Sequence, residues 1–296
     1  KPFIYATALS MKSVTPCTRL TSDENCVITV NNNNEIIGRW RPSGSGAGSV
    51  YNGLAQSSNP TTAGVLGSMG YYNKEKKIGG PFQVNKVLRK AGILLEDRDI
   101  NPTMCLGSMD ISLFDLVAAQ CIFPNNGIYV RPTSIERITD RNGKVLYSAS
   151  EDRQQALNST VAYEILKMMK GVIERGTGAS LRSGRYGTIA PTAGKTGTTQ
   201  NNSDGWFIGI TPDLVTGVWV GAEDRSVRFQ SMNYGQGARM ALPIYGLYMK
   251  EVYKDAKISL STQDFSIPKD YDPKTYDCKE AIIPEEADET DVPFEL

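Results

Sequence analysis

The chain contains no histidine among its 296 residues. A Ser-His-Asp or Cys-His catalytic arrangement needs an imidazole as its base, so neither can be built from these residues. Most catalytic zinc sites also use imidazole ligands, which argues against such a site. Any acid–base chemistry must therefore depend on lysine, tyrosine, aspartate, glutamate or cysteine.

The chain also lacks a net charge, with 32 basic against 32 acidic side chains. Nucleic-acid-binding surfaces normally show a basic excess, so no nucleic-acid partner is expected. No stretch approaches the ~18–20 apolar residues that span a bilayer. The first residue is lysine rather than methionine, so the absence of a signal peptide is uninformative. The remaining composition, 40% hydrophobic and 22% charged, is typical of a globular protein.

The five cysteines form no CxxC pair and show no metal-ligand spacing, and we predict neither a metal nor another cofactor. Cys121 lies in the apolar run VAAQCIF and is interpreted as a small buried hydrophobic residue. Cys17 and Cys26 flank a short polar loop and could form a disulfide in an oxidising compartment.

The first half of the chain is predicted to be mainly helical. Lys1 to about Ser10 opens a helix, with Pro2 at a tolerated first-turn position. Polar residues 31–34 and the glycine-rich residues 43–48 predict loop or hairpin. At Asn59-Pro60 the proline either ends one helix or begins the next. Further helices are expected over 49–58, 61–69, 81–92 and 111–124.

The second half is predicted to add a sheet. Two strands are expected within residues 129–148 around an Asn142-Gly143 hairpin turn, followed by an amphipathic helix over 158–175. A last helix is expected over 238–254, and the acidic residues 257–296 predict a partly ordered extension. Three consecutive strand-like segments predict an antiparallel sheet: 188–199, 204–212 and 214–224.

Two glycine-containing segments could be taken for phosphate sites, and neither fits. Residues 43–48 lack a following GK[ST]. The segment 194–196, Gly-Lys-Thr, would need a glycine at position 189, which is isoleucine, and a helix where strand follows. Read as Lys195-Thr196-Gly197, the same residues suit a carboxylate, with an ammonium beside hydroxyls and a glycine that lets a ligand backbone approach.

A second short motif, upstream of Lys195-Thr196-Gly197, makes a specific interpretation of that segment possible. Ser57-Ser58-Asn59 is a Ser-x-Asn, which alone carries little information because serine and asparagine are common at caps and turns. Ser-x-x-Lys, Ser-x-Asn and Lys-Thr-Gly together are the motif set of penicillin-binding proteins and related β-lactamases. Two of the three are present in order, and Lys1 with the following Pro-Phe-Ile-Tyr supplies the lysine of the third.

The chain resembles the transpeptidase domain of a bifunctional (class A) penicillin-binding protein. KPFIYATAL resembles the run after the family's nucleophilic serine, GLAQSSNPTTAGVL its Ser-x-Asn segment, and ERGTGASL its lead-in to the Lys-Thr-Gly strand. The strongest match is AGKTGTTQNNSDGWFIGITPDLVTGVWVG, and the matches spread over about residues 1–250 in the family's order. The resemblance implies an α+β transpeptidase fold, an antiparallel sheet flanked by helices, over residues 1–256, with 257–296 as an acidic C-terminal extension.

The resemblance places the nucleophilic serine three residues before Lys1, ahead of the first residue of the sequence. The family's first two sheet strands, its glycosyltransferase domain and its membrane anchor would also lie upstream. We therefore expect a fragment truncated at its N-terminus, inactive on its own. A smaller departure is Pro60 directly after the Ser-x-Asn, which could alter the helix start there.

The resemblance implies a peptidoglycan D,D-transpeptidase that works through a serine acyl-enzyme. Without histidine, the base for the serine must be another group, and a lysine one helical turn away lies on the same helix face. Lys1 would be this base, with its pKa lowered by desolvation and by the neighbouring cation of Lys195. Ser57 would bridge the two lysines and pass the proton to the leaving amine, and Asn59 would hold the amide of the acyl group.

The Lys-Thr-Gly strand would bind the substrate. Thr196 and Thr198, with Lys195, would hold the terminal carboxylate, and Gly197 would let the ligand approach. The backbone N–H of Thr198 would supply one oxyanion donor. The implied partners are D-alanyl-D-alanine stem peptides, a second stem peptide's amine as acceptor, and β-lactam antibiotics, at the periplasmic (extracytoplasmic) face of the cytoplasmic membrane.

Two alternatives remain open at this point. A serine β-lactamase or β-lactam sensor shares the motif trio, but such domains usually lack the GTGASL lead-in and the long strand pattern; fast β-lactam turnover would favour it. A non-catalytic domain that binds wall peptides would explain the missing serine, although it would not need Lys1, Ser57, Asn59 and Lys195 together. The codon three residues upstream of Lys1 discriminates between the enzyme and this domain.

Overall fold

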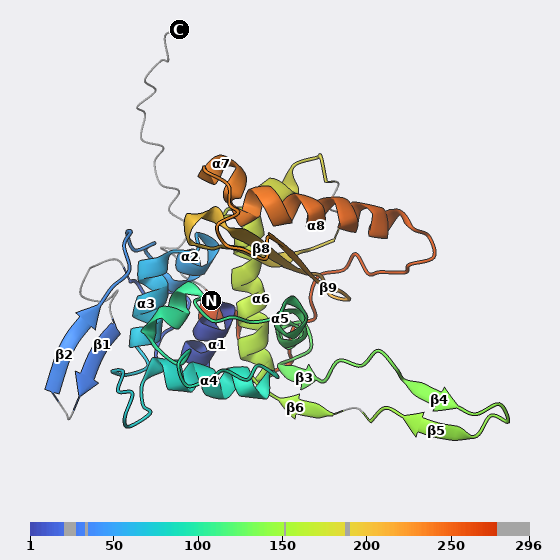
Figure 1. Ribbon diagram of the computed structural model, residues 1–296, viewed down its shortest axis with the longest axis horizontal. Helices are drawn as coiled ribbons and strands as arrows, with labels where there is room; N and C mark the ends of the chain where they lie inside the picture. The colour runs from blue at the N-terminus through green and yellow to red at the C-terminus, as the bar shows by residue number, and fades with distance from the viewer. Residues whose placement is uncertain (21–27, 33–34, 151, 187–189, 277–296) are drawn as a thin grey trace, which may run out of the picture.

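The computed structural model describes residues 1–20, 28–32, 35–150, 152–186 and 190–276. Its architecture is α+β, as predicted, with an antiparallel sheet between helices (Figure 1). The sheet has the order β7-β8-β9, with strands β7 (Ala193–Thr198), β8 (Asp204–Ile210) and β9 (Val215–Gly221). Tight turns between consecutive strands make antiparallel neighbours, so the three predicted strand segments are confirmed, although β7 begins later than expected.

Helices pack on both sides of this sheet. The helix α6 (Ser159–Glu174) contacts β7, and α8 (Gly237–Lys254) contacts β8 and β9. Gly209 on β8 lets α8 approach, because a Cβ at that position would lie 2.2 Å from the Tyr245 ring. Phe207 packs against the same ring, with the centroids 4.8 Å apart. Apolar contacts of this kind bury the inner face of α8 against the sheet.

The helix α1 (Pro2–Ser10) lies inside the molecule. Each of its residues from Pro2 to Leu9 is buried, and it contacts α3, α4 and α6. A helix that is apolar on all sides belongs in a core, and the sequence Pro-Phe-Ile-Tyr-Ala fits that position. The predicted N-terminal helix is therefore confirmed, and its burial fixes the place of Lys1 directly before it.

Three of the other helices begin at residues whose side chains cap them. Ser49, Ser58 and Asn158 each accept a backbone N–H of the first turn of α2, α3 and α6 respectively. Pro60 lies in the first turn of α3, where its missing N–H costs nothing, so it begins this helix rather than disturbing it. The remaining α-helices of the described residues are α2 (Val50–Ala55), α3 (Asn59–Gly67), α4 (Gly80–Lys90), α5 (Leu113–Gln120) and the short α7 (Met232–Gly235).

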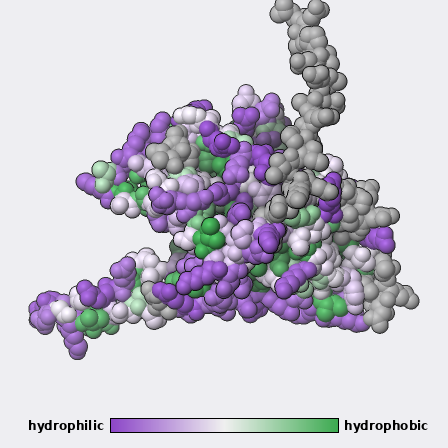
Figure 2. Space-filling model, turned by 180° about the vertical axis from the view of Figure 1, so that it is seen from behind, coloured by the Kyte–Doolittle hydropathy of each residue, from purple (hydrophilic) through white to green (hydrophobic). Residues whose placement is uncertain are grey.

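Two hairpins lie outside the central sheet. The polar segment before residue 43 forms β1 (Ile28–Asn32) and β2 (Glu35–Trp40), and residues 43–48 are loop, both as predicted. The expected Asn142-Gly143 turn joins β4 (Arg137–Thr139) to β5 (Val145–Ser148), with Gly143 at a φ of +83°. This hairpin projects from the body as an arm, rooted in the pair β3 (Ile128–Val130) and β6 (Arg153–Gln155) (Figures 1 and 2). β3 lies at the start of the predicted strand segment, and β6 was not predicted.

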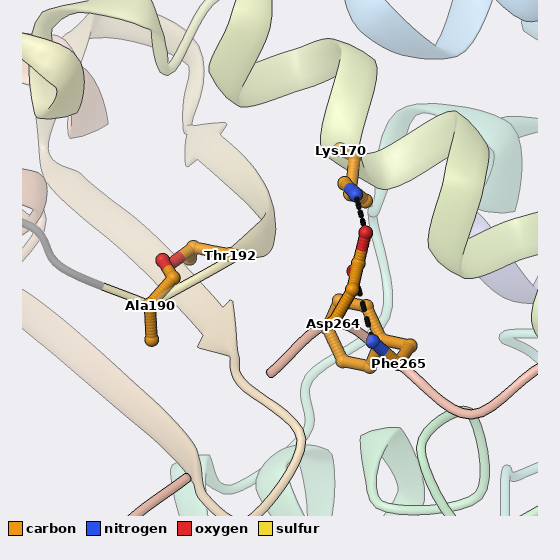
Figure 3. Close-up of polar contacts among 5 residues, drawn as sticks. All are labelled: Lys170, Ala190, Thr192, Asp264 and Phe265. Atoms are coloured by element: carbon orange, nitrogen blue, oxygen red, sulfur yellow. Dashed lines mark hydrogen bonds and ion pairs between the residues drawn. The ribbon is translucent and has the colours of Figure 1, made fainter. Parts of the chain in front are cut away.

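After α8 the chain returns across the molecule to α6. Asp264 pairs with Lys170 at 2.6 Å, and the Phe265 side chain is buried beside it (Figure 3). Tyr271 meets Tyr163 edge to face, with ring centroids 4.8 Å apart. These contacts fasten the first part of the acidic extension to the body, while residues 277–296 lie outside the described part of the chain. The domain boundary at residue 257 stays a prediction.

The cysteines differ in their surroundings. Cys105 and Cys121 are free thiols, and Cys121 is half-buried rather than buried. Cys17 is disulfide-bonded, whereas Cys26, the partner considered from the sequence, lies outside the described residues. Across the described ranges, no helix combines the length and the apolar character that crossing a membrane requires.

Candidate active site

The side chain of Lys1 lies where α1 begins. Its Nζ donates to Asn59 Oδ1 at 2.6 Å, to the Ser57 carbonyl oxygen at 2.6 Å and to Ser57 Oγ at 3.2 Å. The Lys1 carbonyl accepts the N–H of Ile4, which starts the first turn of α1. The buried helix thus holds the lysine against the junction between α2 and α3.

Ser57 occupies a conformation that is rare for residues other than glycine. Its φ is +56°, in the left-handed region, where the backbone of any residue other than glycine is strained. The junction is fixed by two backbone bonds, from Ser57 N to Leu54 O at 3.2 Å and from Ser58 N to Gly53 O at 2.9 Å. This turn between two short helices places the Ser57 hydroxyl beside Lys1 instead of in solvent.

Lys195 reaches the same hydroxyl from the sheet. Its Nζ donates to Ser57 Oγ at 2.8 Å and to the Thr196 carbonyl oxygen at 2.8 Å. The residue is only 8% exposed on β7. Ser57 Oγ therefore lies between the amines of two lysines that are far apart in the sequence.

Burial lowers the pKa of both lysines. It lowers that of Lys1 to about 8, and together with the nearby Lys1 charge it lowers that of Lys195 well below its usual value. Lys1 donates to three acceptors and Lys195 to two, so hydrogen bonds hold both amines in place.

The strand β7 presents one free edge within the described residues. β8 occupies the other edge, with Lys195 opposite Ile208 and Gly197 opposite Trp206. Thr199 N donates to Asp204 O, and alternation along an antiparallel ladder then turns the N–H groups of Thr196 and Thr198 away from β8. This edge can receive an extended peptide by strand addition.

The predicted site residues fall into two groups. Lys1, Ser57, Asn59 and Lys195 are joined by direct hydrogen bonds, as a shared site requires. Gly197 and the two threonines follow Lys195 along β7. Thr198 Oγ1 accepts the N–H of Gly237 at 3.0 Å, and Thr196 Oγ1 contacts Thr177 Oγ1 at 2.6 Å.

Sequence reasoning gave no role to two residues near this site. Thr177 belongs to the segment ERGTGASL, where its hydroxyl looked no different from any other. Cys105 is buried close enough to interact with the Lys1 charge, although burial dominates and raises its thiol pKa to about 12. A thiol in this state is not a nucleophile at neutral pH. Among the described residues, no group of three histidine, cysteine, aspartate or glutamate side chains could hold a metal ion.

A sequence model described as the penicillin binding protein transpeptidase domain matches residues 1–239. The chain belongs to this transpeptidase family. Penicillin-binding protein 1A of Neisseria meningitidis serogroup A is 29% identical over 266 residues, 86% of this chain and 31% of that protein. That of Aquifex aeolicus is 34% identical over 166 residues, 56% of this chain and 21% of the relative. The transpeptidase chain thus spans less than a third of these relatives.

Solved structures of class A penicillin-binding proteins share the transpeptidase fold. Penicillin-binding protein 1A from Haemophilus influenzae superposes with a TM-score of 0.70 at 21% identity, covering 91% of this chain and 43% of that one. The PonA1 protein from Mycobacterium tuberculosis, in complex with penicillin V, gives 0.62 at 23% identity, covering 91% and 71%. The family and fold expected from the motifs are confirmed, and a transpeptidase domain of this family is consistent with peptidoglycan cross-linking.

Proposed function

We propose that this transpeptidase domain cross-links peptidoglycan stem peptides through a serine acyl-enzyme, and that β-lactams acylate the same serine. The observation that carries the proposal is the convergence of two lysines with lowered pKa values on one serine hydroxyl. A chain without histidine needs such amines for proton transfer. The nucleophile is the serine expected three residues before Lys1, one helical turn away.

Substrate binding prepares Lys1 to act as the base. A carboxylate beside Lys195 favours the charged form of that lysine and raises its pKa. The new cation near Ser57 lowers the pKa of Lys1 below about 8, so the proton moves from Lys1 toward Lys195. Neutral Lys1 then accepts the proton of the nucleophile as the acyl bond forms, and Ser57 delivers a proton to the leaving amine.

The donor stem peptide lies antiparallel to β7 along the free edge. Its terminal carboxylate binds Lys195, Thr196 and Thr198, and Asn59 holds the amide of the acyl group. The Thr198 N–H, which the strand turns outward, stabilises the oxyanion, and one such donor is typically worth about 10²–10³ in rate. The amine of a second stem peptide then attacks the ester and releases the cross-linked product.

The parent protein carries this domain on the outer face of the cytoplasmic membrane, together with a glycosyltransferase domain and a membrane anchor. The motif resemblance to class A proteins supports this arrangement, as does the short span of the chain relative to its curated relatives. The penicillin V complex of PonA1 supports β-lactams as ligands of the same site.

The test is the intact mass of the protein after incubation with benzylpenicillin. The chain is produced with its own upstream residues, through the expected serine and the strands before it. A single adduct that persists for hours supports the proposal, because a transpeptidase releases the penicilloyl group slowly. The adduct should form at least 100-fold more slowly in Lys1→Ala, since a general base typically contributes 10²–10⁴ in rate.

Lys254→Ala is the matched control, because this lysine lies on the far end of α8 and pairs only with Glu251 on the surface. It should be acylated at the parental rate. An adduct that disappears within seconds would identify a β-lactamase instead. A folded protein that forms no adduct would be a non-catalytic domain that binds wall peptides, and the proposal would be wrong.

A further inference from the structure

Thr177 connects the substrate-binding strand to the chain segment that carries Ser57. Its Oγ1 lies 2.6 Å from Thr196 Oγ1 on β7. On the other side, Thr177 N donates to Ala55 O at 3.2 Å, and Gln56 Nε2 donates to Arg175 O at 3.1 Å. Residues 175–177 therefore bridge the end of α2 and β7, the two elements between which Ser57 and Lys195 meet.

The end of α6 fixes this bridge in place. Gly178 N donates to Val172 O at 2.9 Å and closes the last turn of the helix. Gly176 lies so close to α2 that a Cβ there would be 2.2 Å from Ala55 O. The Arg175 guanidinium lies 4.3 Å from the centroid of the Tyr51 ring. With its backbone held on both sides, Thr177 presents its hydroxyl to Thr196 at a defined position.

The contact between the two hydroxyls determines where the Thr196 proton can point. Each hydroxyl has one proton to donate and can also accept, so one of the pair donates and the other accepts. If Thr196 donated to Thr177, its proton would be unavailable to a ligand. If Thr177 donates, Thr196 Oγ1 is satisfied as an acceptor and its own proton is free for an anion.

We propose that Thr177 is a positioning residue whose hydroxyl donates to Thr196 and thereby directs the Thr196 proton toward the carboxylate of the substrate. The inference rests on the proposed function, because it takes Thr196 to be a carboxylate ligand. Thr177 itself does not touch the substrate. Loss of the Thr177 hydroxyl should therefore slow the reaction only of ligands that carry the carboxylate. A variant with a damaged fold would react more slowly with every ligand.

The test compares two ligands that differ only at the carboxylate, benzylpenicillin and its methyl ester. The variants are Thr177→Val, which keeps the shape and loses the hydroxyl, and Thr177→Ser, which keeps the hydroxyl. Since loss of a hydrogen bond to a charged group is expected in Thr177→Val, this variant should slow acylation by benzylpenicillin about 10- to 150-fold. Acylation by the ester should change less than twofold, and Thr177→Ser should restore the rate with benzylpenicillin.

Thr192→Val is the control for losing a buried threonine hydroxyl close to the same strand. The Thr192 hydroxyl donates to Ala190 O at 3.0 Å, just before β7 (Figure 3). This variant should leave the ratio of the two acylation rates unchanged. If Thr177→Val slows both ligands equally, or neither, Thr177 has only a structural role and the inference is wrong. If the unsubstituted protein forms no adduct with either ligand, the proposed function fails, and the inference fails with it.

Discussion

At the scale of single residues, the site depends on the sharing of one hydroxyl by two amines. Ser57 Oγ lies 3.2 Å from Lys1 Nζ and 2.8 Å from Lys195 Nζ. Lys195 is buried and Lys1 is half-buried, so burial lowers the pKa of both amines, and the Lys1 charge lowers that of Lys195 further. The chain thus holds two amines whose pKa values lie below that of an exposed lysine.

This arrangement predicts the pH dependence of acylation. The pKa of Lys1 is lowered to about 8, so it loses its proton as the pH rises through 8 rather than through 10.5. The second-order rate constant for acylation by benzylpenicillin reports the pKa of the free enzyme. Because the proposed acylation uses the one proton that the lysine pair shares, we expect this rate constant to fall as the pH rises through about 8 in stopped-flow measurements. A midpoint near 10.5 would show that Lys1 is not desolvated.

At the scale of elements, the position of α8 on the sheet depends on a glycine, which has no side chain. At Gly209 a Cβ would lie 2.2 Å from the Tyr245 ring, which is itself buried against Phe207. The ring cannot retreat without leaving its place in the core. Since Thr198 accepts the N–H of Gly237 where α8 begins, a shift of this helix would also reach the substrate-binding strand.

We therefore expect Gly209→Ala to destabilise the protein by about 1–3 kcal/mol, the usual cost of overpacking a core. Gly184→Ala is the control, since a Cβ there meets no atom within 4 Å. It should change the free energy of unfolding by less than about 0.5 kcal/mol. Urea denaturation followed by circular dichroism measures both. Equal stability of Gly209→Ala and the parent would mean that α8 adjusts freely on the sheet.

The elements also show how far the sequence determines the structure. Several helices begin at capping residues and the strands of the sheet are joined by tight turns, which are local signals. β3 lies at the start of the predicted strand segment, whereas β6 was missed because Arg153, Gln154 and Gln155 carry no hydrophobic pattern and the pair forms only when distant segments meet. Lys1, Ser57, Asn59 and Lys195 were identified from their motifs. Thr177 was not, because its role depends on a contact with Thr196 that tertiary packing creates.

At the scale of the whole molecule, the chain after α8 fastens the outside of the fold to α6. The contacts that do this include the Asp264–Lys170 ion pair, the burial of Phe265 and the edge-to-face contact of Tyr271 with Tyr163. The Asp264 side chain is 57% exposed, so water screens the pair, and exposed pairs contribute about 0–1 kcal/mol. Burying an aromatic ring contributes more. The apolar contact, and not the charges, should hold the segment in place.

We expect Phe265→Ala to lower the free energy of unfolding by about 3 kcal/mol and Asp264→Asn by less than about 1 kcal/mol. Ile267→Ala serves as the control, because this side chain is 66% exposed and should matter little. Thermal unfolding monitored by calorimetry compares the three. A larger effect of Asp264→Asn than of Phe265→Ala would contradict this order.

The burial of α1 from Pro2 to Leu9 has a consequence for how the molecule opens. Water reaches the backbone amides of a helix enclosed by α3, α4 and α6 only when those neighbours separate. Hydrogen exchange at these amides must then follow global unfolding rather than local fraying. The helix that carries Lys1 thus belongs to the slowest-exchanging part of the fold, so the proposed base is held for as long as the protein stays folded.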